Sequence, residues 1–264
     1  MNSSISPKRP LIEIDHVDRR FTSPEGKIIQ VLRDFNLTVN EGEFCAVVGP
    51  TGCGKSTTLS LISGLARPNA GHVYINGQEV ENTDPRVGFV FQTDAVFPWL
   101  NVLDNVCAGP KFRGMEKAQI KDLAIDWIRR VGLAGFEAHF PHQLSGGMRK
   151  RVALAQTFIN SPDILLMDEP FSALDVQTKL LMQGELLQLW SKHRAAVVFV
   201  THDIDEAITL ADKVFVLSKG PATVKSVYEV DIDRPRVVSE ARYLPRFLEI
   251  SKSIWNDLKE EVNI

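Results

Sequence analysis

Short apolar runs alternate along the chain with segments whose apolar residues recur at helical spacing. The runs predict strands over 11–14, 27–39, 43–48, 87–91, 163–167, 195–200 and 213–217. Helices are predicted over 55–65, 174–192 and 203–210. Apolar strands that alternate with helices form parallel sheets covered on both faces. The pattern therefore predicts an α/β fold.

The segment 101–160 breaks this alternation, because it lacks strand signals and is mostly helical in period, with interruptions at Gly109-Pro110 and Pro141. We expect a core over 11–95 and 161–230, a helical insertion over 96–160 and a helical tail over 231–264. In the tail, one apolar stripe recurs every three or four residues and is expected to pack on the domain's own surface. The stripe consists of Phe247, Ile250, Ile254, Leu258 and Val262. The polar start of the chain, 1–10, is expected to be disordered.

Composition excludes several classes of protein. With 264 residues, 44% hydrophobic, 24% charged and a net charge of −3, the chain has no general positive field to hold nucleic acid. Its longest apolar runs, of about six residues, are too short to cross a bilayer, and its start lacks a secretion signal. Cys45, Cys53 and Cys107 fit neither a disulfide framework nor a zinc site. We expect a protein of the reducing cytoplasm.

The stretch Gly49-Pro-Thr-Gly-Cys-Gly-Lys-Ser follows a predicted strand and opens a predicted helix, which is the context of a P-loop. Its glycines let successive N–H groups point at phosphate oxygens, and the helix N-terminus adds positive potential. Lys55 would reach the outer phosphates and Ser56 would ligate Mg²⁺. The predicted nucleotide-binding residues of this loop are Gly49, Pro50, Thr51, Gly52, Cys53, Gly54, Lys55, Ser56 and Thr57.

Two further motifs point to phosphate chemistry. A buried strand ends in Asp168 and Glu169, which are expected to hold Mg²⁺ and to polarise water, although strands that end in acids are common. Ser145, Gly146 and Gly147 begin another helix and predict a second anion site at its N-terminus. The alternative for these three residues is a plain serine N-cap with a flexible entry.

Together these motifs resemble the nucleotide-binding subunit of an ATP-binding cassette (ABC) transporter, over about residues 11–230. Residues 144–148 are similar to the signature motif, Gln92 to the Q-loop, 172–175 to the D-loop and His202 to the switch histidine. Phe21 stands where the family places the aromatic residue that stacks on adenine. Each has an ordinary alternative: Gln92 as a strand-end polar residue, His202 satisfied by the backbone, and Phe21 packed in a sheet. Their order along the chain favours the family.

This resemblance implies a P-loop NTPase (RecA-like) core with a parallel sheet, an antiparallel β subdomain and an inserted α-helical subdomain. It further implies that two such domains face each other head to tail, each ATP meeting the P-loop of one and the signature of the other. The implied catalytic residues are Glu169, His202 and Gln92, and the implied Mg²⁺ ligands are Ser56, Gln92 and Asp168. Ser145, Gly146, Gly147 and Asp175 complete the implied ATP site.

The stretch 97–106, Phe-Pro-Trp-Leu-Asn-Val-Leu-Asp-Asn-Val, is similar to one in importers of the nitrate, sulfonate and taurine type. There it lies near the groove that receives the coupling helix of the membrane subunit; its aromatic residues are equally compatible with a place in the core of the insertion. Residues 233–236 and the helix with Trp255 also resemble the tails of that group. Two positions depart from the family: Lys150 replaces the commoner Gln, and Gln156 replaces an Arg, which puts the packing of that helix in question.

The resemblance implies a peripheral ATPase on the cytoplasmic face of the cell membrane that energises import of a small anion. Its implied partners are a second copy of itself, integral membrane permease subunits and, indirectly, a solute-binding protein. A soluble ABC ATPase without a membrane partner is the alternative, but the chain has no heptad run for a long coiled coil. A P-loop kinase shares the first motif and has no use for 144–148. Nitrate, an aliphatic sulfonate, taurine and a pyrimidine precursor all stay open as solutes.

Overall fold

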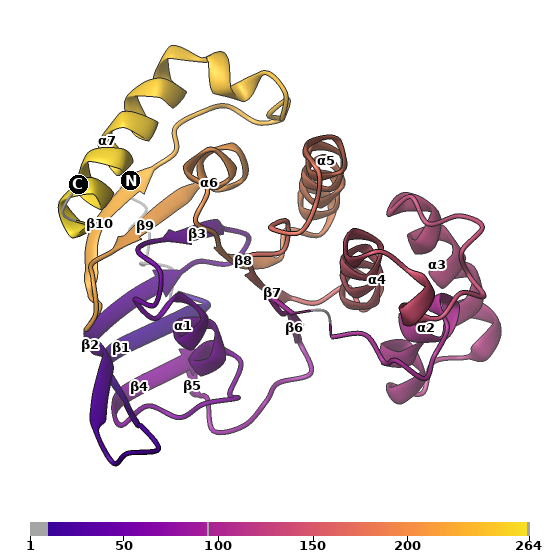
Figure 1. Cartoon of the computed structure of the whole chain (residues 1–264), viewed down its shortest axis with the longest axis horizontal. Coiled ribbons are helices and arrows are strands. Elements are labelled where there is room, and N and C mark those ends of the chain that lie inside the picture. Colours follow the sequence, from indigo (N-terminus) through magenta and orange to yellow (C-terminus); the bar gives the residue numbers. More distant parts are fainter. Residues whose placement is uncertain (1–9, 94, 263–264) are drawn as a thin grey trace, which may run out of the picture. The chain divides into compact units, whose positions relative to one another are not determined.

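The computed structural model describes residues 10–93 and 95–262, the last of these by its backbone only. Nearly all of the segment expected to be disordered, and the side chain of Val262, thus lie outside the described residues. The chain divides into two compact units. Unit 1 contains the described residues up to Asp84 and those from Arg194 onward, and unit 2 is Pro85–His193 (Figure 1).

Unit 1 holds a group of strands around β3 (Phe44–Val48). β3 pairs in parallel with β8 (Ala196–Val200) and with β9 (Lys213–Leu217), and β10 (Val224–Glu229) adds to β9 in antiparallel orientation. Every residue of β3 and β8 is buried, which agrees with their continuous apolar sequences. Along the chain, β3 is followed by α1 (Lys55–Ile62), and β8 is followed by α6 (Ile204–Leu210).

Unit 1 also contains an antiparallel sheet in the order β2-β1-β4-β5. Its strands are β1 (Ile12–Thr22), β2 (Ile28–Val39), β4 (Ala70–Ile75) and β5 (Gln78–Glu79). The sequence pattern predicted β2 and the start of β1 but neither β4 nor β5. β4 buries only Val73 and Ile75, so its alternation is short. At Gly71, φ is +74° and an added Cβ would come 2.2 Å from His16 O, so the close approach to β1 requires glycine.

Unit 2 pairs β6 (Val87–Val90) with β7 (Ile164–Asp168) in parallel. The chain between these strands is helical, as predicted, and α5 (Val176–His193) follows β7. The intervening helices are α2 (Val102–Phe112), α3 (Lys117–Arg130), the short 3-10 helix η1 (Pro141–Gln143) and α4 (Gly146–Phe158). α2, α3 and α4 contact one another, and α4 also contacts β6.

The interruption predicted at Gly109-Pro110 is wrong, because α2 continues to Phe112. Pro110 has no N–H to donate to the carbonyl of Val106, yet the helix continues through it for two more residues. The carbonyl of Gly109 still accepts the N–H of Arg113 at 3.1 Å. The predicted interruption at Pro141 is confirmed, since η1 begins there.

The tail of unit 1 consists of the short 3-10 helix η2 (Ala241–Tyr243) and α7 (Pro245–Val262). The predicted apolar stripe packs inward: Phe247, Ile250 and Ile254 are at most 3% exposed. Among residues 10–93 and 95–262, none of the helices combines the length and the apolar character needed to cross a membrane.

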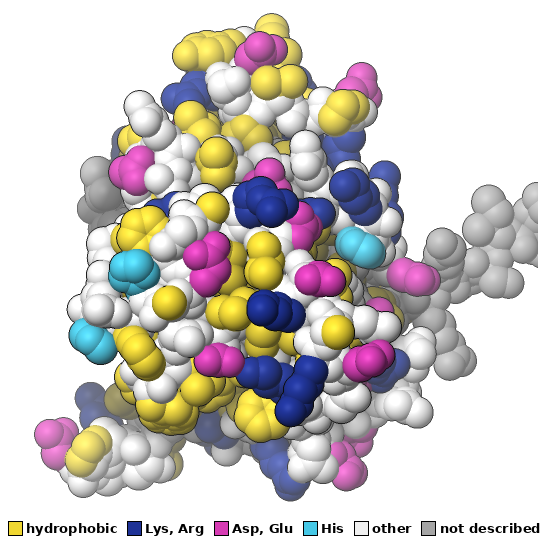
Figure 2. Space-filling model, turned by 90° about the vertical axis from the view of Figure 1, so that its right-hand side faces the viewer, with side chains coloured by type: hydrophobic (Ala, Val, Ile, Leu, Met, Phe, Trp, Pro, Cys, Tyr) yellow, Lys and Arg dark blue, Asp and Glu magenta, His cyan; other side chains and the backbone are white. Residues whose placement is uncertain are grey.

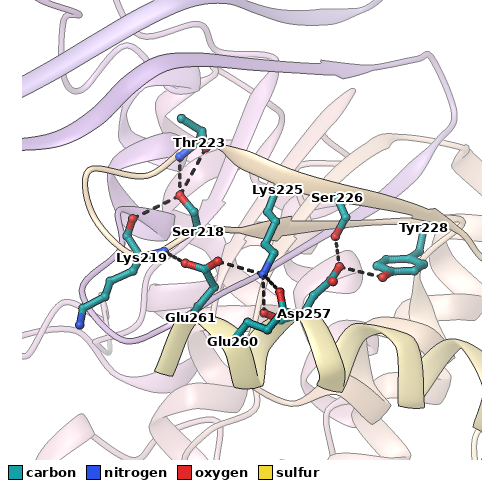
Figure 3. A network of polar contacts seen from close by, with 9 residues as sticks. All are labelled: Ser218, Lys219, Thr223, Lys225, Ser226, Tyr228, Asp257, Glu260 and Glu261. Atoms are coloured by element: carbon teal, nitrogen blue, oxygen red, sulfur yellow. Dashed lines mark hydrogen bonds and ion pairs between the residues drawn. The ribbon is translucent and has the colours of Figure 1, made fainter. Parts of the chain in front are cut away.

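Polar contacts fasten the end of α7 to β10 (Figure 3). Lys225 Nζ lies 2.8 Å from Glu260 Oε2 and 2.9 Å from Glu261 Oε1, and these carboxylates raise the pKa of the lysine. Asp257 accepts hydrogen bonds from the Tyr228 hydroxyl, at 2.7 Å, and from Ser226. Apolar burial and these charged contacts together hold the tail against its own unit.

Candidate functional site

The loop at 49–54 connects β3 to α1 in unit 1 and has the backbone of a phosphate-binding loop. Gly52 and Gly54 have φ values of +77° and +115°, in the region that favours glycine. An added Cβ at Gly54 would lie 2.8 Å from Leu32 Cδ2. Gly54 is the N-cap of α1 and supplies no side-chain cap. The first N–H groups of α1 are therefore available to an anion.

The side chains of this loop are arranged around Lys55. Its Nζ donates to the carbonyls of Gly49, at 2.8 Å, and Pro50, at 2.9 Å, and the residue is only 7% exposed. Thr51 and Ser56 are exposed, and Thr57 is half-buried. Burial raises the pKa of the Cys53 thiol, so this residue stays uncharged beside the loop.

Phe21 and His202, the other predicted site residues of unit 1, are both exposed. Phe21 lies near the end of β1 opposite Ile29, and the guanidinium of Arg19 lies 4.5 Å from its ring centroid. Phe21 is 42% exposed, so it is not buried in the sheet. His202 follows β8, directly before Asp203, which caps α6.

In unit 2, the predicted catalytic residues meet at the end of β7. Asp168 is the last residue of the strand and is 6% exposed. Glu169 has a φ of +44°, a strained value for a residue with a side chain. Gln92 Nε2 lies 3.3 Å from Glu169 Oε2, and the hydroxyl of Ser172 donates to Glu169 O at 2.9 Å. The structure thus brings Gln92, Glu169 and the D-loop together.

The second predicted anion site is also in unit 2, at the start of α4. Ser145 is exposed and caps the helix, accepting the N–H of Met148 at 3.3 Å. An added Cβ at Gly147 would lie 3.6 Å from Ala173 O, so the N-terminus of this helix lies beside the D-loop. Gly146 is half-buried.

Asp175 ends the D-loop and accepts the hydroxyl of Thr178 at 2.6 Å and its N–H at 3.0 Å. These hydrogen bonds lower the pKa of Asp175, so the carboxylate is ionised at neutral pH. Its oxygens stabilise the first turn of α5.

Sequence reasoning missed the position of Lys150, which is buried in α4 with its Nζ on the carbonyls of Phe91 and Gln92. The only hint of this position in the sequence was that Lys150 replaces the Gln that is commoner in the family. It also missed that α7 borders the P-loop. A cavity of about 460 Å³ is lined by Gly49, Pro50, Thr51, Lys219, Trp255, Leu258, Lys259 and Glu261.

Unit 2 also has a groove of about 270 Å³ between β6, α2 and α4. Phe97 and Gln156 line it, as does Phe112, which is 84% exposed. Figure 2 looks onto the side where α2 and α3 lie and shows hydrophobic side chains exposed among charged ones. The helix whose packing Gln156 put in question forms as predicted, and its Gln156 carbonyl accepts a hydrogen bond from Asn160 at 2.8 Å.

Asn105 holds the loop that carries Phe97, one of the residues that line this groove. It is fully buried, and its side chain bonds to the backbone of Phe97, Leu100 and Asn101. Trp99, in the same loop, is 71% exposed. Phe97 and Leu100 are half-buried, so the aromatic run is split between the interior and the surface.

Over the described ranges, no group of three or more His, Cys, Asp and Glu side chains is placed to hold a metal ion. The predicted Mg²⁺ ligands are instead the hydroxyl of Ser56, the amide of Gln92 and the carboxylate of Asp168. These are oxygen donors with a single charge among them. Such a set fits Mg²⁺, which is commonly held by one or two carboxylates, water and substrate phosphates.

The chain is similar to known ATP-binding proteins. The family model described as ABC transporter matches residues 32–172. An uncharacterised ABC transporter ATP-binding protein from Methanocaldococcus jannaschii is 46% identical over 90% of this chain and 87% of its own length. A nitrate import ATP-binding protein from Synechococcus elongatus is 41% identical over 88% of this chain and 87% of its own. A taurine import ATP-binding protein from Ruegeria pomeroyi is 36% identical over 95% and 96%.

A solved ATP-binding cassette, described as a dimer in a post-hydrolysis state with ADP and Pi, has a TM-score of 0.77 and 33% identity. It covers 84% of this chain and all of its own length. The predicted P-loop NTPase fold is confirmed by this match. The chain therefore belongs to the ABC transporter family, as an ATP-binding subunit that hydrolyses ATP.

Proposed function

We propose that this chain powers an importer for a small anion, working as a head-to-tail dimer on the cytoplasmic face of the membrane. Nitrate, taurine and other sulfonates are the proposed class of solute, because the related importers carry nitrate and taurine in their names. The solute itself meets the permease and a solute-binding protein rather than this chain.

The main support for a dimer is that the chain has two separate helix N-termini at which an anion could bind. One begins α1 after the P-loop, and the other begins α4 at Ser145. Since a single P-loop already satisfies the phosphates of one nucleotide, the second N-terminus serves an ATP held by another copy. The dimeric state of the related cassette supports the same arrangement.

Within this proposal, the residues divide the chemistry of ATP hydrolysis. Lys55 and the N–H groups of residues 49–57 bind the phosphates, and Phe21 stacks on the adenine. Glu169 takes the proton of the attacking water, Gln92 orients that water, and His202 contacts the γ-phosphate. Asp175 positions the D-loop, and Ser145, Gly146 and Gly147 bind the ATP of the partner.

The strained backbone at Glu169 supports its role as the base. A φ of +44° persists only where the surroundings enforce it, and strain of this kind gathers at functional sites. The contact of Gln92 Nε2 with Glu169 Oε2, at 3.3 Å, supports a role of Gln92 in restraining the carboxylate. Mg²⁺, when bound, would neutralise charge on the phosphates; Ser56, Gln92 and Asp168 are its proposed ligands.

The groove of unit 2 is the proposed docking site for a short helix of the permease. Phe112 lines it and is exposed, and the exposed Trp99 lies 5.6 Å from the ring of Phe97, another lining residue, so the groove suits the apolar face of a helix. The resemblance of 97–106 to the stretch near this groove in importers supports the same assignment.

Affinity purification tests the membrane partnership. The chain, tagged at its N-terminus, is isolated from native membranes in mild detergent, and the proteins that co-purify are identified by mass spectrometry. A multi-spanning protein in near-equal amount is expected. Phe112→Glu should release it, whereas Leu123→Glu, an exposed position on α3 outside the groove, should not. Recovery of soluble proteins alone would leave a soluble ABC ATPase and overturn the importer.

A further inference from the structure

The feature that the proposed function leaves unexplained is the buried lysine of α4. Lys150 is 1% exposed, and its Nζ donates to Phe91 O at 2.5 Å and to Gln92 O at 2.9 Å. Lysine is among the residues least often buried, because removing an ammonium from water is costly unless hydrogen bonds replace the solvent. A side chain needed only for packing would not carry this charge.

The two carbonyls that Lys150 meets follow directly after an edge strand. β6 ends the strand order of its sheet, so one side of it has no neighbouring strand. α4 contacts this strand, and the Thr157 hydroxyl lies 3.4 Å from Phe89 O and 3.1 Å from Ala153 O in its own helix. Lys150 continues the contact between α4 and this segment past the end of β6, where Phe91 and Gln92 are no longer part of the strand.

The segment held by Lys150 is the one that reaches the catalytic carboxylate. The backbone carbonyl of Gln92 accepts a hydrogen bond from Lys150 Nζ. The side chain of Gln92 contacts Glu169, with Nε2 lying 3.3 Å from Glu169 Oε2. The same helix that carries Lys150 begins at Ser145, beside the D-loop. A continuous series of contacts therefore runs from Glu169 through Gln92 and Lys150 to the N-terminus of α4, all within unit 2.

We propose that Lys150 is a positioning residue, which ties the Q-loop to the signature helix so that Gln92 and Ser145 move as one body. The inference rests on the proposed function, since that function gives Gln92 and Ser145 their roles. Lys150 itself does not touch ATP. It fixes the backbone from which Gln92 reaches Glu169, and it transmits displacement of the Q-loop to α4.

Steady-state phosphate release by purified variants tests the proposal. Lys150→Met keeps the length of the side chain and removes its donors. We expect kcat to fall about tenfold or more while the KM for ATP changes less than about threefold, because the binding loop of unit 1 is untouched. Lys150→Gln, which restores N–H donors, should recover part of kcat. Thr157→Val is the matched control, since it removes the hydroxyl of α4 that contacts β6 and leaves Gln92 held.

Two further measurements separate positioning from a purely structural role. In a Gln92→Ala background, Lys150→Met should add little, because both changes break the same series of contacts. Deuterium exchange should quicken in the peptide that ends at Thr93 in Lys150→Met but not in Thr157→Val. Exchange is independent of turnover, so it tests the tie even if the wild-type chain released no phosphate and the proposed function failed. An unchanged kcat, additive effects, or unchanged exchange would each overturn the proposal.

Discussion

Asn105 is fully buried, and its side chain holds the loop that leads into α2. Its Oδ1 accepts the N–H of Phe97 at 2.7 Å, and its Nδ2 lies 2.9–3.1 Å from the carbonyls of Phe97, Leu100 and Asn101. The carbonyls of Phe97 and Asn101 also accept backbone N–H groups. In Asn105→Ala, the groups left without these contacts are the N–H of Phe97 and the carbonyl of Leu100.

Each buried polar group without a partner costs about 1–3 kcal/mol, so two of them predict a loss of about 2–6 kcal/mol. Phe97 and Leu100 are only half-buried, and water that reaches them favours the lower half of this range. Asn101→Ala is the matched control in the same loop. It removes one N-cap bond, from Asp104 N at 2.7 Å, and should cost only about 1 kcal/mol.

Urea unfolding followed by circular dichroism measures both variants. Asn105→Ala should lose at least about twice the free energy of unfolding lost by Asn101→Ala. It should also weaken recovery of the permease, because the loop with Trp99 lies at the proposed docking groove. Equal losses in the two variants would refute the idea that Asn105 holds this loop.

Three other outcomes follow from the structure. Glu43 is half-buried, which raises the pKa of its carboxyl, but hydrogen bonds from Asn40 N–H and Lys213 outweigh this desolvation and lower the pKa overall. Its stabilising effect should therefore be full above the unfolded value of 4.5 and be lost as pH falls through the lower folded pKa, so Glu43→Gln should flatten the acid side of a stability-against-pH curve. Burial also raises the pKa of Cys53, so a disulfide reagent at neutral pH should label this thiol only after urea is added; rapid labelling of the native chain would be contrary. Lys225→Met should leave the melting temperature of the chain nearly unchanged, since solvent screens its ion pairs with Glu260 and Glu261, and a large drop in a thermal melt would contradict this.

The elements that the sequence predicted well are those with one dominant signal. β3 and β8 are continuous apolar runs because both of their faces are covered, and α7 shows a clear stripe because one face packs inward. β4 and β10 were missed for the opposite reason. β10 has no fully buried residue, so its sequence has no apolar alternation to detect.

The site was predictable where a motif states its chemistry and unpredictable where distant segments meet. The P-loop requires glycine at Gly52 and Gly54, and the sequence shows that requirement directly. The contact between Gln92 and Glu169 depends on strand pairing, which local patterns do not encode. Lys150 appears in the sequence as an ordinary charged residue of an amphipathic helix, and only the fold shows that it is buried.

In the proposed function, ATP closes two copies of this chain, and Glu169 then acts as the base in its hydrolysis. Light scattering coupled to gel filtration of Glu169→Gln, with Mg²⁺ and either ATP or ADP, tests it directly. With turnover removed and binding intact, the variant should elute as a dimer in ATP and as a monomer in ADP, while the wild-type chain hydrolyses ATP. A monomer in both nucleotides, or undiminished hydrolysis by the variant, would contradict the account.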